Sequence, residues 1–179
     1  GAAVISADPL YRFDAASIRA RIEETVPVVM AETRRNRHEF VWKAIPDPET
    51  LERVRRAAME EFLTDYSAGR AAGRYVDAEL PHLPFSDGAF DLALVSHFLF
   101  LYSAQFSLDF HIAAVRELLR VARTVRIFPL LELGGIPSRH GDGVLASLRA
   151  EGYAVDVVPV GYEFQQGGNR MLRVERVGA

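Results

Sequence analysis

The sequence contains no cysteine among its 179 residues. This absence excludes disulfide bonds, thiolate metal sites and cysteine nucleophiles, and it fits a protein of the reducing cytoplasm. Long apolar runs are missing too: the longest, residues 92–102, is interrupted by Ser96 and His97 and is too short to span a bilayer. No basic segment opens the chain, so the sequence predicts neither a signal peptide nor a membrane partner.

The sequence also lacks an excess of charge of one sign. It has 21 Lys and Arg against 24 Asp and Glu, a formal net charge of −3, and so gives no electrostatic basis for binding nucleic acid. Hydrophobic residues make up 49% and charged residues 25% of a length typical of one domain. We therefore expect a single domain over residues 1–179, of no predicted oligomeric state. Because the first residue is Gly rather than Met, we expect the natural start to lie upstream.

The first third of the sequence predicts one strand and two helices. Residues 2–7 are small or β-branched, which is typical of a strand. Asp14 is a good N-cap for one helix, and Asp47, followed by Pro48, is a good N-cap for another. The apolar spacing of the second helix predicts a buried stripe made of Leu51, Val54, Ala58 and Phe62.

The middle of the sequence predicts strands that alternate with helices. A short strand is expected at residues 74–79. Residues 91–95 form a nearly continuous apolar run, which is typical of a strand buried on both faces. One helix is expected from about Ser107, and Asp142 is a candidate N-cap of a second helix. Residues 124–133 read as a strand between them.

Two strands are expected at the end of the chain, at residues 153–164 and 170–177. Only "QQGGN" separates them, and such a short turn favours an antiparallel pair. The predicted order is therefore strand, helix, helix, strand, strand, helix, strand, helix, strand, strand. This alternation indicates the α/β class.

One stretch carries a resemblance to a known family. Residues 83–103, "LPFSDGAFDLALVSHFLFLYS", resemble the centre of class I S-adenosylmethionine-dependent methyltransferases. Many of these carry a Leu-Pro-Phe loop, an acidic-Gly turn and a Phe-Asp pair that opens the fourth strand. The matching residues here are Leu83, Pro84, Phe85, Asp87, Gly88, Phe90 and Asp91.

The resemblance covers essentially the whole chain. Residues 117–130, "ELLRVARTVRIFPL", look like the helix and fifth strand that follow in the family, and residues 153–177 match its antiparallel hairpin. The resemblance implies a Rossmann-like methyltransferase sheet that is mostly parallel and ends in this hairpin. It also implies S-adenosylmethionine as cofactor and methyl transfer to a small-molecule acceptor.

The sequence departs from the family at its beginning. The family fold opens with a strand and a Gly-rich turn that touches the methionine end of the cofactor, whereas only residues 1–7 precede Asp8 here. We therefore expect an N-terminally truncated domain that binds the cofactor poorly. In the family the missing strand lies between the second and the fourth. We expect the strand at residues 2–7 either to pair directly with the one at residues 91–95 or to leave a gap there.

Asp8 is the first candidate for cofactor binding. The resemblance implies that an acidic residue at the end of this strand accepts hydrogen bonds from the ribose hydroxyls, with Pro9 and Leu10 beside it. An aspartate before a proline is also typical of a local turn cap, so both interpretations stay open.

The loop after the next strand is the second candidate, because the resemblance implies that it covers the adenine. It contains Asp77, Ala78, Glu79 and Leu80. The sequence does not decide which acidic residue would contact the adenine edge. A plain solvated loop is the alternative.

Ser96 and His97 follow the strand at residues 91–95, where the resemblance implies the sulfonium and the acceptor. A polar pair in an apolar stretch needs partners, because an unpaired buried polar group costs about 1–3 kcal/mol. His97 is the candidate catalytic base for an acceptor hydroxyl or amine, since the ordinary pKa of histidine is near neutral. A structural histidine with satisfied hydrogen bonds is the slightly favoured interpretation.

Aromatic side chains near these residues allow two interpretations. Phe98, Phe100 and Tyr102 could hold a sulfonium by cation–π attraction, but packing in the core is the favoured interpretation. Tyr11 and Phe13 could flank the ribose or adenine, with the same alternative.

The remaining titratable residues give weaker signals. Glu132 ends a strand and could contact the acceptor, although a solvated loop acid is the favoured interpretation. The other histidines show no pair at ligand spacing, so no metal is predicted. They are His38, His82, His111 and His140.

Three functions compete on this sequence. Methyl transfer by direct displacement needs few specific residues, because it depends mainly on positioning, and it is the favoured function. A non-catalytic binding or regulatory protein on the same scaffold is the alternative, since fold does not fix function. A nucleotide-dependent oxidoreductase is disfavoured by the C-terminal antiparallel pair.

Overall fold

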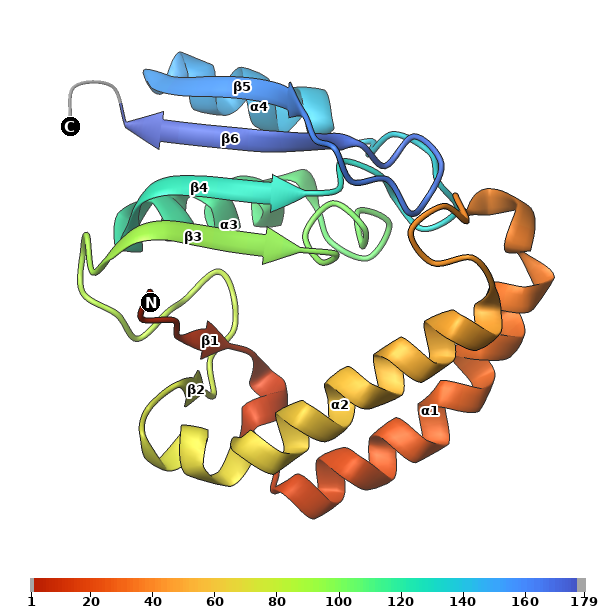
Figure 1. The fold of residues 1–179 in the computed structure, drawn as a ribbon. Helices are drawn as coiled ribbons and strands as arrows, with labels where there is room; N and C mark the ends of the chain where they lie inside the picture. Colours follow the sequence, from red (N-terminus) through yellow and green to blue (C-terminus); the bar gives the residue numbers. More distant parts are fainter. Residues whose placement is uncertain (1, 177–179) are drawn as a thin grey trace. The chain divides into compact units, whose positions relative to one another are not determined.

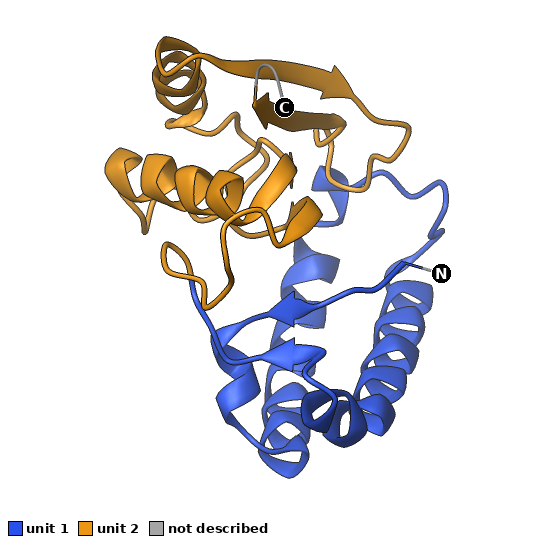
Figure 2. Ribbon diagram, turned by 90° about the vertical axis from the view of Figure 1, so that its left-hand side faces the viewer, with its two compact units in different colours: residues 1–79 blue, residues 80–179 orange. Residues whose placement is uncertain are grey.

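The computed structural model describes residues 2–176. It divides into two compact units, unit 1 at residues 1–79 and unit 2 at residues 80–179 (Figure 2). The predicted order of helices and strands is confirmed, from β1 to β6 with α1 to α4 between them (Figure 1). The α/β class is therefore confirmed as well. Within the described residues, no helix is long and apolar enough to cross a membrane.

The two helices of unit 1 begin at the predicted caps. In α1 (Ala15–Arg35) the Asp14 carboxylate accepts a hydrogen bond from the Ser17 N–H at 2.7 Å. In α2 (Pro48–Ala71) Asp47 does the same for Thr50 at 2.6 Å. Both carboxylates satisfy an N–H that the helix itself leaves without a partner.

The buried face of α2 differs from the predicted stripe. Leu51 is buried as expected, but Val54 is 49% exposed, and Ala58 is exposed as well. The helix instead buries Leu63 and Tyr66. The prediction is confirmed for Leu51 and for Phe62, which packs against the core of unit 1, and it is wrong for Val54 and Ala58.

Four aromatic rings form the centre of unit 1. Tyr11, Phe62, Tyr66 and Tyr75 lie with ring centroids 5.2–6.3 Å apart. Tyr66 is 1% exposed, and its hydroxyl donates to the carbonyls of Tyr11 (3.1 Å) and Phe13 (2.8 Å). One side chain of α2 thus fixes the segment that leads into α1.

The strands of unit 1 are shorter than predicted. β1 (Ser6–Ala7) and β2 (Tyr75–Val76) form a parallel pair with Ser6 opposite Tyr75. The expected strands at residues 2–7 and 74–79 were each longer, but the ladder between them has only two rungs. Of residues 2–7, only Ser6 and Ala7 pair with residues of β2, so the strand does not extend over the rest of that range.

Unit 2 contains a four-stranded mixed sheet in the order β3-β4-β6-β5. Its strands are β3 (Phe90–Ser96), β4 (Ala122–Phe128), β5 (Tyr153–Pro159) and β6 (Arg170–Arg176). β3 and β4 are parallel, and β6 is antiparallel to both β4 and β5. The predicted antiparallel pair is confirmed. The predicted direct pairing of the first strand with the strand at residues 91–95 is not formed, because β1 and β3 belong to different sheets.

The helices of unit 2 pack on one face of this sheet (Figure 1). α3 (Leu108–Val121) begins where the sequence predicted a helix, with Ser107 as its N-cap, and α4 (Gly141–Ala150) lies beside it. The cap predicted at Asp142 is wrong, since His140 occupies the N-cap position. The core between helices and sheet contains Val115, Leu119, Val125, Ile127, Val144, Leu148, Leu172 and Val174.

The strand expected to be buried on both faces is buried on one. In β3, Ala93 and Val95 pack against the core, whereas Leu92 is 41% exposed and Leu94 is 69% exposed. The prediction was wrong because β3 is an edge strand and both helices of unit 2 cover the same side of its sheet.

Replacing Tyr66 by phenylalanine tests the hydrogen bonds at the centre of unit 1. Tyr66→Phe keeps the ring but leaves the buried Tyr11 carbonyl without this donor and the Phe13 carbonyl with Arg70, so we expect a loss of about 1–3 kcal/mol in the free energy of unfolding. Urea denaturation followed by circular dichroism measures it. Tyr102→Phe, at an exposed site, is the control and should change stability by less than about 0.5 kcal/mol. Equal stability of both variants would contradict the role given to Tyr66.

Candidate functional site

Two aspartates follow the last rung of the β1–β2 pair. Ala7 pairs with Val76 in the parallel register, so Asp8 and Asp77 both follow the last rung. The Asp8 N–H donates to the Val76 carbonyl at 3.2 Å. Carboxyl ends of parallel strands are where α/β sheets bind ligands. This edge of unit 1 can therefore offer carboxylate oxygens to a diol.

Asp8 also has a local structural role. Its Oδ1 accepts a hydrogen bond from the Leu10 N–H at 2.8 Å and caps the 3₁₀ helix η1 (Pro9–Arg12). Arg12 lies close to the other carboxylate, with Nε 3.7 Å from Asp77 Oδ1. The turn-cap interpretation of Asp8 is thus confirmed, and its ribose-binding role stays a prediction that the cap does not exclude.

The predicted adenine loop is divided between the two units. Ala78 is half-buried and Glu79 is exposed at the end of unit 1. Leu80 begins unit 2, where its side chain packs against the core of that unit. Leu80 therefore has a packing role of its own, and the adenine role of the loop stays a prediction.

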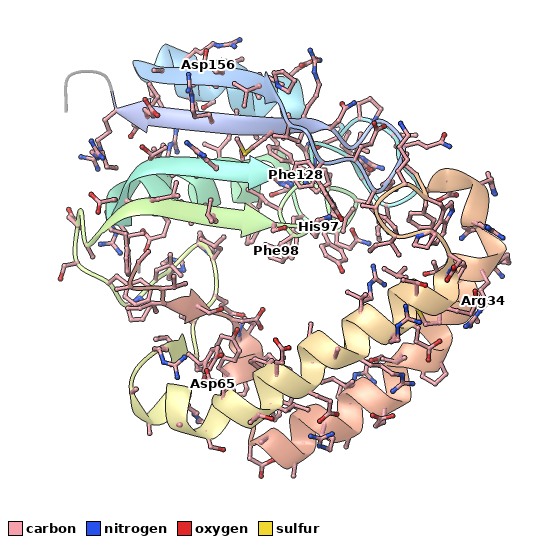
Figure 3. All side chains as sticks on the ribbon, viewed as in Figure 1. Arg34, Asp65, His97, Phe98, Phe128 and Asp156 are labelled. Carbon is pink, nitrogen blue, oxygen red and sulfur yellow. The ribbon has the colours of Figure 1, made fainter. Side chains whose placement is uncertain are left out.

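Ser96 is the last residue of β3, and His97 lies just beyond the carboxyl end of that strand (Figure 3). Ser96 Oγ is 2.7 Å from His97 Nδ1, and the His97 backbone N–H donates to the Phe128 carbonyl at 2.7 Å. The imidazole ring meets the Phe128 ring edge-on, with centroids 5.5 Å apart. Both polar residues are exposed, so the pair is accessible to a ligand.

The backbone of His97 is strained. Its φ is +55°, and it is the only non-glycine residue with positive φ among residues 2–176. Such a conformation costs of order 1 kcal/mol and is concentrated at functional sites. Together with the Ser96 hydrogen bond, this backbone fixes where the imidazole stands beyond the end of β3.

The aromatic residues after His97 have different environments. Phe100 is 1% exposed and belongs to the core, as the packing interpretation predicted. Phe98 and Tyr102 are 36% and 37% exposed, and their ring centroids are 6.1 Å apart. In unit 1, Tyr11 belongs to the aromatic core and Phe13 is 50% exposed.

Glu132 is not the solvated loop acid that the sequence favoured. Its side chain is 4% exposed. Arg139 holds it through Nε and Nη2 at 2.8–3.1 Å and through its backbone N–H at 2.7 Å. The Arg139 guanidinium thereby keeps the pKa of Glu132 below its usual range. Glu132 fixes the loop after β4 rather than facing an acceptor.

Sequence reasoning missed a buried polar network around His111. This residue is 0% exposed, and its Nδ1 and Nε2 lie 2.8 Å and 2.9 Å from the carbonyls of Ser107 and Leu99. Ser103, 3.3 Å from Nε2, links the histidine to Ser138 through a 2.7 Å hydrogen bond between hydroxyls. The signal in the sequence was a histidine within the apolar stripe of α3.

The network joins three segments of unit 2: the loop after β3, the loop after β4 and helix α3. Leu99 and Ser103 follow β3, Ser138 follows β4, and His111 belongs to α3. Burial lowers the pKa of His111, so the neutral imidazole is the favoured form. A neutral imidazole has one N–H and can donate to only one of the two carbonyls at a time.

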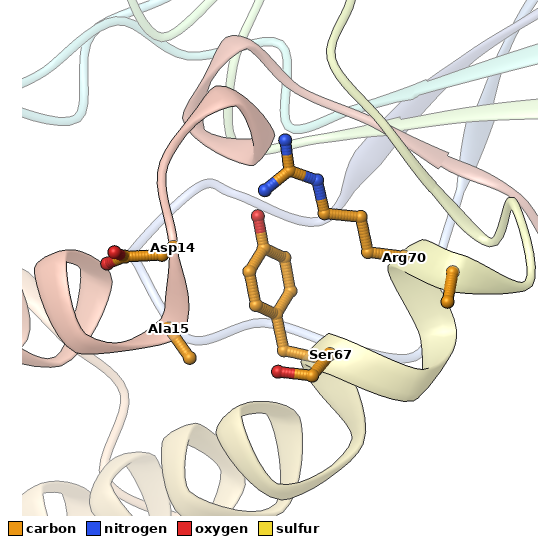
Figure 4. A pocket seen from close by; sticks show the side chains of 6 residues that line it. Asp14, Ala15, Ser67 and Arg70 are labelled. Carbon is orange, nitrogen blue, oxygen red and sulfur yellow. The ribbon is translucent and has the colours of Figure 1, made fainter.

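A cavity of about 390 Å³ lies within unit 1 between the start of α1 and the last turns of α2 (Figure 4). Asp14, Ser67 and Arg70 line it together with three further residues. The Asp14 carboxylate serves as the cap of α1, and Arg70 donates to the Phe13 carbonyl at 3.3 Å. The charged side chains of Asp14 and Arg70 thus stabilise local structure, and we assign no ligand to this cavity. Across residues 2–176, no three carboxylate or imidazole side chains are grouped to hold a metal ion.

Comparison with known proteins finds one distant relative. The chain is 29% identical over 174 residues to an uncharacterized protein of Methanocaldococcus jannaschii. The alignment covers 97% of this chain and 76% of that protein. No protein-family model matches the chain, and no solved structure matches it.

The His111 network predicts a pH dependence of stability. The folded pKa lies below the ordinary value of 6.5, so the unfolded chain binds more protons and stability is lost as the pH falls through 6.5 and below. We expect the urea midpoint to decrease from pH 7.5 to pH 5.5 and to decrease less in His111→Gln. His82→Gln, at an exposed histidine, is the control. If both variants keep the wild-type pH dependence, His111 does not cause it.

Proposed function

We propose that this protein is a methyltransferase of the Rossmann-like class that transfers a methyl group from S-adenosylmethionine to a small-molecule acceptor. The observation that carries the proposal is the Ser96–His97 pair, held by a strained backbone at the carboxyl end of β3. The motif residues support it, because the loop with Asp87 and Gly88 leads directly into this strand.

The contacts of this loop hold it against α3. Arg120 of α3 donates to the carbonyls of Leu83 (3.0 Å) and Phe85 (2.8 Å) and to the Asp87 carboxylate (2.7 Å). The Gly88 N–H donates back to the Arg120 carbonyl at 2.8 Å. The loop thus fixes where β3 begins, and consequently where Ser96 and His97 stand.

The residues of unit 1 fit the ribose end of the cofactor. Asp8 and Asp77 end two parallel strands, and Asp8 has a second oxygen beyond the one that caps Leu10. We propose Asp8, Pro9 and Leu10 for the ribose, and Ala78, Glu79 and Leu80 for the adenine. The resemblance assigns the methionine end of the cofactor to a Gly-rich turn.

When bound, S-adenosylmethionine supplies an electrophilic methyl carbon. An acceptor oxygen or nitrogen forms the new bond to that carbon as the carbon–sulfur bond breaks and its electron pair goes to sulfur. We propose that His97 takes the proton which the acceptor releases, with Ser96 orienting the ring through Nδ1. Ser96 and the strained backbone thereby supply positioning rather than chemistry.

A non-catalytic binding protein on this scaffold is the second candidate. The observation that favours it is the engagement of Asp8 as a cap of η1, without a Gly-rich turn before it in this sequence. On this interpretation the strained His97 would serve binding alone.

Calorimetry with S-adenosylmethionine tests the proposal directly. We expect binding heat for the chain extended upstream and little for residues 1–179, because the methionine end would lack its backbone N–H donors. Absence of heat from both proteins would exclude the cofactor. Binding without transfer to any acceptor would favour the non-catalytic candidate.

Substitution of Asp8 separates its two roles. Asn caps a helix about as well as Asp, so Asp8→Asn should keep η1 and remove the charge that binds the diol. We expect the Kd for S-adenosylmethionine in the extended protein to rise about tenfold or more. Asp156→Asn, at an exposed site on β5, is the control and should leave the Kd unchanged. An unchanged Kd in Asp8→Asn would exclude the ribose role.

A further inference from the structure

Three loops of unit 2 lie at one edge of its sheet. β3 and β4 are parallel, and β5 runs in the same direction because β6 is antiparallel to both β4 and β5. The loops that follow these strands, residues 97–107, 129–140 and 160–169, therefore leave the sheet at the same edge. Ser96 and His97 stand at this edge as well.

Most of the large apolar side chains that unit 2 exposes are found in these loops. They are Phe98, Tyr102, Leu133, Ile136 and Tyr162, and their exposed fractions run from 36% to 56%. We call this set the apolar edge. Its members are connected: the Leu133 N–H donates to the carbonyl of Leu101, next to Tyr102, at 3.1 Å. Tyr162 meets the Phe128 ring at 6.0 Å, and Phe128 meets His97.

The same loops carry very little charge. Residues 97–107 contain no Asp, Glu, Lys or Arg. The carboxylate after β4, Glu132, is buried on Arg139, and Glu163 accepts from the Gly167 N–H at 2.8 Å. Recognition of a phosphate or of an anionic lipid uses clustered Arg and Lys, which this edge does not offer. The electrostatics therefore favour an uncharged ligand.

The apolar tip of the loop after β4 is held rigidly. Leu131 and Pro137 form an antiparallel bridge, and the Glu132 N–H donates to the Ile136 carbonyl at 2.8 Å. Gly134 and Gly135 close the turn with φ of +90° and +78°, a region that glycine adopts without strain. A preorganised apolar surface loses little conformational entropy on binding.

We propose that the apolar edge binds an uncharged small molecule with an aromatic ring, and that this molecule is the methyl acceptor. The second clause rests on the proposed function. Ring faces at Phe98, Tyr102 and Tyr162 suit a planar apolar ligand, and His97 at the same edge can receive a proton from its hydroxyl or amine. Leu133 and Ile136 select against charged competitors by offering them no partner.

A fluorescence titration with N-phenyl-1-naphthylamine, an uncharged aromatic probe, tests the ligand class. We expect saturable binding to the full chain and a Kd raised about tenfold or more in the double variant Leu133→Ser, Ile136→Ser. Leu94→Ser is the matched control, because Leu94 is 69% exposed on the sheet face rather than at the edge, and its Kd should stay within about twofold of wild type.

Four results would overturn the inference. The first two are equal Kd values of the edge and control variants for the probe, and equally tight binding of 1-naphthyl phosphate. The third is binding of the wild type to phosphatidylcholine vesicles that the edge variant loses. The fourth is a concentration-dependent dimer of the wild type in sedimentation that the edge variant does not form. The last two would assign the edge to a lipid surface or to a second copy of the chain. Circular dichroism checks folding, and Tyr102→Ser, which should also weaken probe binding, serves if the double variant unfolds.

The two proposals fail separately. If the upstream-extended protein binds S-adenosylmethionine but no variant affects the probe, the inference is wrong and the methyl-transfer proposal stands. If the probe binds at the apolar edge but the extended protein gives no heat with S-adenosylmethionine, the ligand class is right and its assignment as methyl acceptor is wrong.

Discussion

The parallel ladder between β3 and β4 is the constraint on which the rest of unit 2 depends. It runs from Phe90 opposite Ala122 to Ser96 opposite Phe128, so two loops leave the sheet at the same level. That shared level lets the His97 N–H reach the Phe128 carbonyl and lets Ser103 reach Ser138. The His111 Nε2 then hydrogen-bonds to the backbone of the loop after β3, at the Leu99 carbonyl. Without the ladder, the His97 N–H and the Ser103 hydroxyl would lose their partners at the end of β4 and in the loop after it, and the position of His97 would lose this support.

Unit 1 achieves order by a different route. Its two-rung strand pair contributes little, and its ion pairs between α1 and α2, such as Arg19 with Glu60, are about half exposed and contribute little as well. Aromatic packing therefore supplies the stability: Tyr66 contacts three other rings and also holds the backbone before α1. The position of Asp8, between β1 and this aromatic cluster, follows from that packing.

Local features were predictable from the sequence, and features that depend on distant partners were not. The caps Asp14 and Asp47 were predicted correctly because a cap needs only an N–H two or three residues away. The exposure of Leu94 was missed because it depends on which face of the sheet the helices cover. Glu132 was assigned to solvent although its partner Arg139 is only seven residues on, since the hairpin that brings them together leaves no periodic signal. In the candidate site, the adjacency of Ser96 and His97 was visible directly, whereas the network beneath them requires three segments to meet.

In the loop after β4, two glycines set the path of the backbone, and the side chains that flank them set the chemistry of the exposed surface. Gly134 and Gly135 hold φ values that other residues adopt only with strain, so the path of the chain is set by these two positions. Leu133 and Ile136 flank the turn, and more than half of each side chain is exposed, with no role in the core. Substitutions there change the chemistry of the tip without changing its shape. In the proposed binding role, the loop is therefore a place where single substitutions can change ligand preference while the fold stays the same.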